Sequence, residues 1–98
     1  MSFKKHLQED RRLVILRLLN EANGHDLNSS ILHAALNDFG HQPSRDLLHA
    51  DIAWLEEQGL ITSRSITSVV VVKLTKRGVD VALGRATVPG IKRPGPEE

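Results

Sequence analysis

The side chains best suited to bind another molecule gather first around residue 45. An arginine can form paired hydrogen bonds to guanine or clamp a phosphate, and a histidine can donate to either group. Arg45 and His49 are four residues apart, a spacing that places both on one side of a helix. Gln42 and Ser44 precede them, where an amide and a hydroxyl at a helix start could meet a phosphate. These residue types and spacings predict contact with a polyanion.

A second group of candidates comes from the distribution of charge. Residues 1–61 carry six Lys/Arg and nine Asp/Glu, a net of −3, whereas residues 62–96 carry seven Lys/Arg and one acid, a net of +6. Glu97 and Glu98 bring the total to +1. A field of one sign over a third of a small protein attracts a polyanion, although a charge excess can also serve solubility alone. The cations predicted to supply sequence-independent attraction are Arg64, Lys73, Lys76 and Arg77.

Metal binding is not predicted. The chain has five histidines and no cysteine, so it has no soft thiolate ligand. His33, His41 and His49 are eight residues apart, which does not give the i, i+4 pair that a zinc site on a helix needs. We expect most of the histidines on the surface, with His41 in the turn before the third helix. The lack of cysteine also excludes a disulfide framework.

Catalysis is not predicted either. Ser29, Ser30, Ser44 and Ser63 lack the sequence around an activated nucleophile, and no glycine-rich phosphate-binding loop is present. The carboxylates at 51, 56 and 57 are expected to be ordinary solvated residues of a surface helix. We therefore expect no catalytic residue, no cofactor and no enzyme activity.

Three helices are expected to position the candidate residues. The first runs from about Leu7 to Ala22 and ends at Asn23-Gly24, the second starts at Asn28 or Ser29 and stops at Gly40, and the third covers residues 44–58. Asn28 or Ser29 and Ser44 are the predicted N-caps. The apolar arc of the first helix is unusually wide, with Leu13 on its far side. This width suggests burial against a second subunit.

The period of the apolar residues changes after Gly59. Leu60-Ile61-Thr62 and residues 69–74 are prone to form strands, and the polar residues 63–68 between them indicate a hairpin. Thr75 can cap a short helix over residues 76–83. We therefore predict an α+β domain over residues 1–86, with three helices, a two-stranded hairpin and a short C-terminal helix. Residues 87–98 are expected to form an extended, mobile tail.

Three helices followed by a hairpin is the plan of a winged helix, a helix-turn-helix with a β-ribbon attached. Residues 44–61 resemble the third helix and following strand of many such proteins, in which Leu-Glu-x-x-Gly-Leu-Ile/Val leads into the wing. Leu55, Glu56, Gly59, Leu60 and Ile61 occupy that pattern. Residues 74–78, Leu-Thr-Lys-Arg-Gly, resemble the Leu-Thr-x-x-Gly that follows the wing in ArsR- and MarR-like regulators.

The whole chain further resembles a family of short winged-helix proteins of Mu-like phages and prophages. The matching stretches are residues 10–19, 39–41, 44–46, 54–60, 84–86 and 89–94. The resemblance implies an ArsR-like transcriptional regulator.

Two functions are consistent with the third helix. The first is sequence-specific binding of double-stranded DNA in phage transcriptional control, with Gln42, Ser44, Arg45 and His49 reading the duplex. Arg45 could instead be a solvated residue that pairs with Asp46. The outer face of the helix, with Asp46, Ala50, Ala53 and Glu57, suits DNA poorly.

The alternative function is a protein-interaction adaptor that uses this outer face with Leu47 and Trp54, unless Trp54 belongs to the core. We expect a cytoplasmic protein. If it binds DNA, we expect it to be a homodimer formed through the first helix and the C-terminal helix or tail. We expect no membrane association and no small-molecule effector.

Overall fold

The computed structural model describes residues 2–95, which form four α-helices and a three-stranded antiparallel sheet. The α+β class and the predicted succession of helices and hairpin are confirmed. The elements follow one another as α1 (Phe3–Glu21), a 3-10 turn η1 (Asn23–His25), β1 (Asp26–Asn28), α2 (Ser29–Asn37), α3 (Arg45–Glu57), β2 (Ile61–Ile66), β3 (Val69–Leu74) and α4 (Lys76–Ala82).

The predicted caps begin the helices because their side chains satisfy amides that have no partner inside the first turn. Asn28 Oδ1 accepts the Ile31 amide at 2.8 Å, Ser44 Oγ accepts the Leu47 amide at 3.0 Å, and Thr75 Oγ1 accepts the Gly78 amide at 3.0 Å. α1 begins four residues earlier than predicted, since Ser2 Oγ accepts the Lys5 amide at 3.1 Å.

The sheet differs from the prediction in two ways. β2 continues to Ile66 and pairs with β3 up to Val69, so that the loop predicted over residues 63–68 shrinks to the turn at Thr67 and Ser68. In addition, β1 pairs with the other edge of β3, with Leu27 opposite Val72. β1 is three residues long, Asp-Leu-Asn, and lacks the β-branched residues that signal a strand in a sequence.

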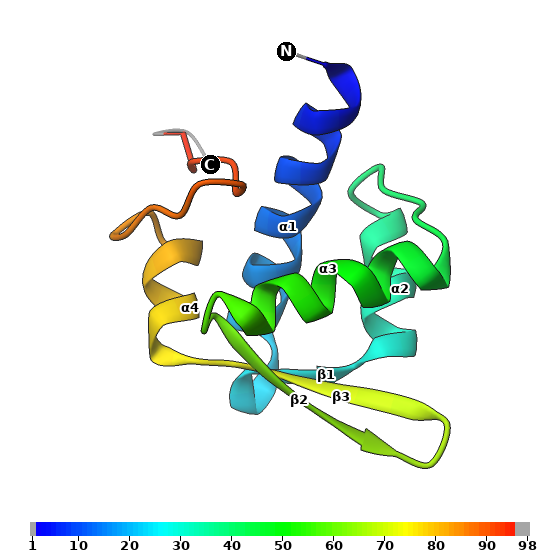
Figure 1. Cartoon of the computed structure of the whole chain (residues 1–98). Coiled ribbons are helices and arrows are strands. Elements are labelled where there is room, and N and C mark those ends of the chain that lie inside the picture. The colour runs from blue at the N-terminus through cyan, green and yellow to red at the C-terminus, as the bar shows by residue number, and fades with distance from the viewer. Residues whose placement is uncertain (1, 96–98) are drawn as a thin grey trace.

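α1 is the central element of the molecule. In Figure 1 it runs between α2 and α4, while α3 crosses in front of it and the sheet lies below. Leu13, which we expected to face a second subunit, is 1% exposed and belongs to the core of its own chain. The wide apolar arc of α1 is therefore used largely within one chain, because neighbours surround this helix.

The predicted tail does not stand apart from the domain over residues 88–92. Val88 and Ile91 are 6% and 7% exposed and join the same core as Leu13. The Lys92 amide also donates to the carbonyl oxygen of Glu9 at 3.2 Å. The segment has no regular secondary structure, so its packing rests on these contacts. Residues 96–98 of the predicted tail lie outside the described residues.

Two glycines are required by the backbone at junctions of the fold. Gly59 has φ +76° and makes the predicted left-handed exit from α3 into β2. Gly90 has φ +98°, and a Cβ there would lie 2.8 Å from Cζ2 of Trp54. Nothing lies within 4 Å of the corresponding position at Gly59. A side chain at either site would strain the backbone, and the two sites differ in the space available for it.

This difference gives a matched test of how tightly the C-terminal segment packs. Gly59→Ala should lower the free energy of unfolding by about 1–2 kcal/mol, because it forces a left-handed alanine. Gly90→Ala should lower it by a further 1–3 kcal/mol or so, because its methyl group also collides with Trp54. Urea denaturation followed by circular dichroism measures both. Equal losses in the two variants would contradict the packing of Gly90 on Trp54.

Candidate nucleic-acid interface

The first turn of α3 presents two of the predicted residues to solvent. Arg45 and His49 are exposed and lie one turn apart, at the edge of the buried face that Leu48, Ile52 and Leu55 form. Within residues 2–95 Arg45 forms no ion pair, so the predicted alternative of pairing with Asp46 is not found. The guanidinium is therefore available to a ligand.

The predicted residues just before α3 already have partners in the fold. Gln42 is exposed, and its side-chain amide donates to Asn37 Oδ1 at 2.8 Å. The Ser44 oxygen caps α3, but its hydroxyl hydrogen can still donate to an anion. Both residues lie beside Arg45 at the end of the helix where its dipole is positive.

The hairpin and α3 share a hollow of about 230 Å³. His49, Ile52, Ala53 and Glu56 line it from α3, and residues 63–65 and Val70 line it from the sheet. Arg64 thus borders the same hollow as His49, although the two are 15 positions apart in the chain, and its pairing with Val71 places its side chain on the same face of the sheet as Lys73. In Figure 1 the hairpin runs beneath α3, and its tip lies toward the same side as the first turn of the helix.

A hydrogen-bonded clamp fixes the hairpin to α3. Ser63 Oγ donates to Glu56 Oε1 at 2.6 Å, and the Ser63 amide donates to Glu56 Oε2 at 3.3 Å. Glu56 is exposed, as the sequence predicted, and both its oxygens also accept hydrogen bonds from β2. The clamp sets the distance between the helix and the hairpin. Its two hydrogen bonds also partly offset the negative charge of the Glu56 carboxylate beside His49.

The other predicted cations do not join this surface as one patch. Lys73 is opposite Thr62 and Asp26 in the register, on the side of the sheet away from the core. It lines a second hollow of about 260 Å³ that also includes Arg64, so that Arg64 borders both hollows. Lys76 and Arg77 begin α4, which lies beside the C-terminal end of α3, far from the first turn of that helix (Figure 1).

A buried ion network that the sequence did not predict holds α3 in place. Asp51 is 1% exposed, and its carboxylate accepts from Arg11 Nε and, at 3.2 Å, from Arg12 Nε. The expectation of a solvated Asp51 is therefore wrong. It fails because α3 crosses α1 at this point, so that the flank carrying Asp51 faces two arginines. Buried charges are stable in such a setting only when they are paired.

Arg12 links this network to the C-terminal segment. Its guanidinium lies 3.9 Å from the ring centroid of Trp54, a cation–π contact, and its Nη1 donates to the carbonyl oxygen of Gly90 at 3.1 Å. Trp54 is half-buried and packs against the hydrophobic core. One side chain thus connects α1, α3 and residue 90.

A second polar cluster joins α1, the turn before α3 and the C-terminal segment. His41 Nε2 lies 2.7 Å from Asp10 Oδ2, and Lys92 Nζ lies 3.3 Å from Asp10 Oδ1. His41 lies in the turn before α3, as expected, and it is buried there. Burial alone would raise the pKa of Asp10, but hydrogen bonds from His41 and Lys92, with their positive charges, hold it below its ordinary value of 3.8.

Among the described residues, no three His, Cys, Asp or Glu side chains come together as a group that could hold a metal ion. No helix in residues 2–95 has the length and apolar content needed to cross a membrane.

The chain is similar to two proteins of phage and bacterial origin. It is 52% identical over 90 residues to the uncharacterized protein gp26 of Escherichia phage Mu, a match that covers 92% of this chain and 93% of gp26. It is 42% identical over 98 residues to an uncharacterized protein of Haemophilus influenzae, covering 99% and 95% of the two chains. No family model matches the chain, and no solved structure matches it.

The buried network can be tested by removing its only negative charge. Asp51→Asn keeps the shape of the side chain but leaves Arg11 and Arg12 buried without a counter-charge, which should cost about 3–5 kcal/mol of stability. Glu57→Gln, an exposed carboxylate on the same helix, should change the unfolding free energy by less than about 0.5 kcal/mol. Urea denaturation of the two variants compares them directly. If both variants lose a similarly small amount of unfolding free energy, the charge of Asp51 does not stabilise the fold.

The Asp10 cluster predicts a dependence of stability on acid. Because the pKa of Asp10 is lower in the folded chain, its contribution is fully present above 3.8 and is lost as the pH falls through the folded-state value. Asp10→Asn should therefore be less stable than the wild type at neutral pH, and the difference should shrink as the pH approaches about 2. Urea denaturation across this range measures the difference. The exposed Asp38→Asn is the control, and a constant gap for Asp10→Asn would contradict the assignment.

Proposed function

The chain belongs to the family of the phage Mu protein gp26, and we propose that it binds double-stranded DNA through the surface shared by α3 and the β2–β3 hairpin. We infer that its fold is a winged helix, in which α3 is the recognition helix and the hairpin is the wing. The order of the elements and the left-handed exit at Gly59 support this inference. Because one relative is a phage protein and the sequence has ArsR-like patterns, we propose transcriptional control as the process.

The observation that carries this proposal is that Arg45 and His49 lie exposed one helical turn apart on α3, next to the hairpin that carries Arg64. Two arginines and a histidine from a helix and a neighbouring hairpin match the phosphate and base groups of a duplex. Neither arginine has an ion pair within the described part of the chain, so neither must break a bond to bind.

The charges of α3 restrict how it can approach DNA. Its outer face carries Asp46 and Glu57 with two alanines between them, and all four are exposed. A duplex lying along this face would meet two carboxylates without direct compensation. We therefore expect the N-terminal end of α3 to enter the groove, where Ser44, Arg45 and the positive end of the helix dipole lie. Arg64 would then contact the phosphates beside it.

A protein-binding function has one observation in its favour. Leu47 is exposed on α3 and, with Leu7 of α1, lines a hollow of about 380 Å³. Exposed apolar residues that cluster in this way are common at interaction sites. Trp54, the other residue expected to serve an adaptor, is instead held by Arg12 and the core. This second candidate function thus rests on the Leu7–Leu47 surface.

The DNA proposal is tested by titrating labelled duplexes, first a mixed-sequence pool and then the sequences it enriches, at two salt concentrations. Affinity should fall steeply with salt, since phosphate contacts release counterions. Arg64→Ala should weaken binding to all sequences similarly. Arg45→Ala should instead reduce the preference for the enriched sequence, by about 1–3 kcal/mol if it contacts a base.

Two controls make this test specific to the proposed surface. Arg85, which follows α4, is also an exposed arginine but pairs with Asp80 of α4, so Arg85→Ala should leave binding unchanged. Because Lys76 begins α4, Lys76→Ala should weaken binding less than Arg64→Ala. Salt-independent binding, or equal effects of Arg85→Ala and Arg45→Ala, would overturn the proposal. In that case Leu47→Ser in a partner capture would test the adaptor function.

A further inference from the structure

The first turns of α1 extend beyond the rest of the molecule (Figure 1). Residues 2–7 are all exposed, and they include two large apolar side chains, Phe3 at 77% and Leu7 at 39% exposure. These two are four positions apart, so they are neighbours on the helix surface. Ordering a helix costs conformational entropy that burial of apolar residues normally offsets. A partner that covered these turns would supply the burial that residues 2–95 do not.

The Leu7–Leu47 surface is the concave part of this region. Its hollow lies between the start of α1 and the first turn of α3, from which Leu47 lines it. The α1 side is lined by Lys4, Leu7, Gln8 and Arg11, at the i, i+3, i+4, i+7 spacing of one helix face. A helix that lay in this hollow would therefore contact α1 and α3 together.

The charges along the hollow have one sign. Lys4 and Lys5 line it, and within residues 2–95 neither forms an ion pair. Arg11 also lines it, but its guanidinium is held by Asp51. No carboxylate is among the described residues around the hollow. The first turn of α1 has no acidic residue, so the lysines add to the positive end of the helix dipole. The hollow is thus complementary to an acidic partner.

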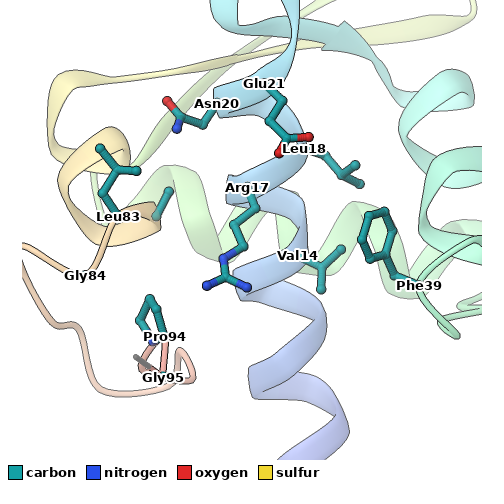
Figure 2. Close-up of a pocket in the computed structure, with 11 residues that line it drawn as sticks. Val14, Arg17, Leu18, Asn20, Glu21, Phe39, Leu83, Gly84, Pro94 and Gly95 are labelled. Carbon is teal, nitrogen blue, oxygen red and sulfur yellow. The ribbon is translucent and has the colours of Figure 1, made fainter. Parts of the chain in front are cut away.

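The hollow of about 770 Å³ farther along α1 has no such preference for one charge. Arg17 and Glu21 both line it. Figure 2 shows Arg17 extending toward Pro94, whereas the Glu21 carboxylate lies on the other side of the helix. A partner of either charge would meet a like charge there. Charge therefore distinguishes the two hollows.

The apolar residues decide which kind of acidic partner fits the Leu7–Leu47 surface. A DNA duplex could place phosphates on the two lysines, but its charged backbone would then lie against exposed leucines. A protein helix that has carboxylates on its flanks and apolar residues between them matches both groups.

We propose that the Leu7–Leu47 surface binds an acidic amphipathic helix of another protein. The apolar residues of that helix pack on Leu7 and Leu47, and its carboxylates pair with Lys4 and Lys5. This proposal rests on the second candidate function given above and does not require that the chain bind DNA.

Selection from a displayed library of random peptides, each of roughly 16 residues or about four helical turns, tests the proposal on the full chain. The enriched peptides should be acidic, with apolar residues at i, i+3 or i+4, and i+7. Labelled copies are then titrated with variants. Leu7→Ser should weaken their binding about 10-fold or more, because it removes a central apolar contact. Leu83→Ser, at an exposed leucine that borders the other hollow, should leave it unchanged.

Reversing the lysines tests the preference for acidic peptides. Lys4→Glu with Lys5→Glu should weaken binding of the enriched peptides about 10-fold or more. It should instead favour versions of those peptides in which Lys replaces every Asp and Glu. Acidic residues stabilise the start of a helix, so this loss would not come from unfolding, and circular dichroism melts check that. Lys76→Glu with Arg77→Glu, the matched change at the start of α4, should not reverse the preference.

Each result decides the proposal. Acidic, apolar peptides whose binding needs Leu7 and reverses with the lysines would establish the site. No enrichment, or enriched peptides that ignore these substitutions, would overturn it. Vesicles of phosphatidylserine with phosphatidylcholine and the mixed-sequence duplex are tested in parallel. If the lysine reversal abolishes binding to one of these while no peptide is enriched, the surface recognises a membrane or DNA and the proposal is wrong. The Arg45 and Arg64 variants are scored separately on duplexes, so either proposal can fail alone.

Discussion

The carboxylate of Asp51, enclosed by the guanidinium groups of Arg11 and Arg12, is the interaction on which the arrangement of α1 and α3 depends. A buried ion is far more costly without its partner than with it, so the two helices can cross only where these three side chains meet. Arg12 extends the same constraint to Trp54 and to the carbonyl oxygen of Gly90. The network therefore holds two parts of the chain in position on α1: the recognition helix that we propose and the C-terminal segment.

The network also changes how the charges of the sequence should be counted. Its three groups carry a net charge of +1 and are buried, so the surface charge of residues 1–61 is −4 rather than the −3 of the sequence. The difference in sign between the two parts of the chain is thus larger on the surface than in the sequence. The proposed ligand contacts use cations that are exposed, while Arg11 and Arg12 serve the fold. Residue type alone does not distinguish these two uses.

Several of the stretches that carry the resemblance to Mu-like phage proteins meet in the two polar clusters that connect α1 to α3 and to the C-terminal segment. Asp10, Arg11 and Arg12 come from the first, His41 and Trp54 from two others, and Gly90 with Lys92 from the last. Their contacts hold α1, α3 and the C-terminal segment together. The resemblance is therefore rooted in residues that determine the fold, and the proposed function rests on the exposed residues of α3 and the hairpin.

The sequence by itself determined the parts of this protein that local interactions control. Helix caps, glycine exits and the change of apolar period depend on neighbours within a few residues, and they predicted all four helices and both hairpin strands. Only the tertiary structure decided which charges are buried, where β1 pairs, that Val88 and Ile91 join the core, and which cations share a surface. Asp51 has the same local sequence features as a solvated residue, and its burial follows from contact with arginines about 40 positions away. Contacts of that range depend on how the helices cross, which no local pattern records.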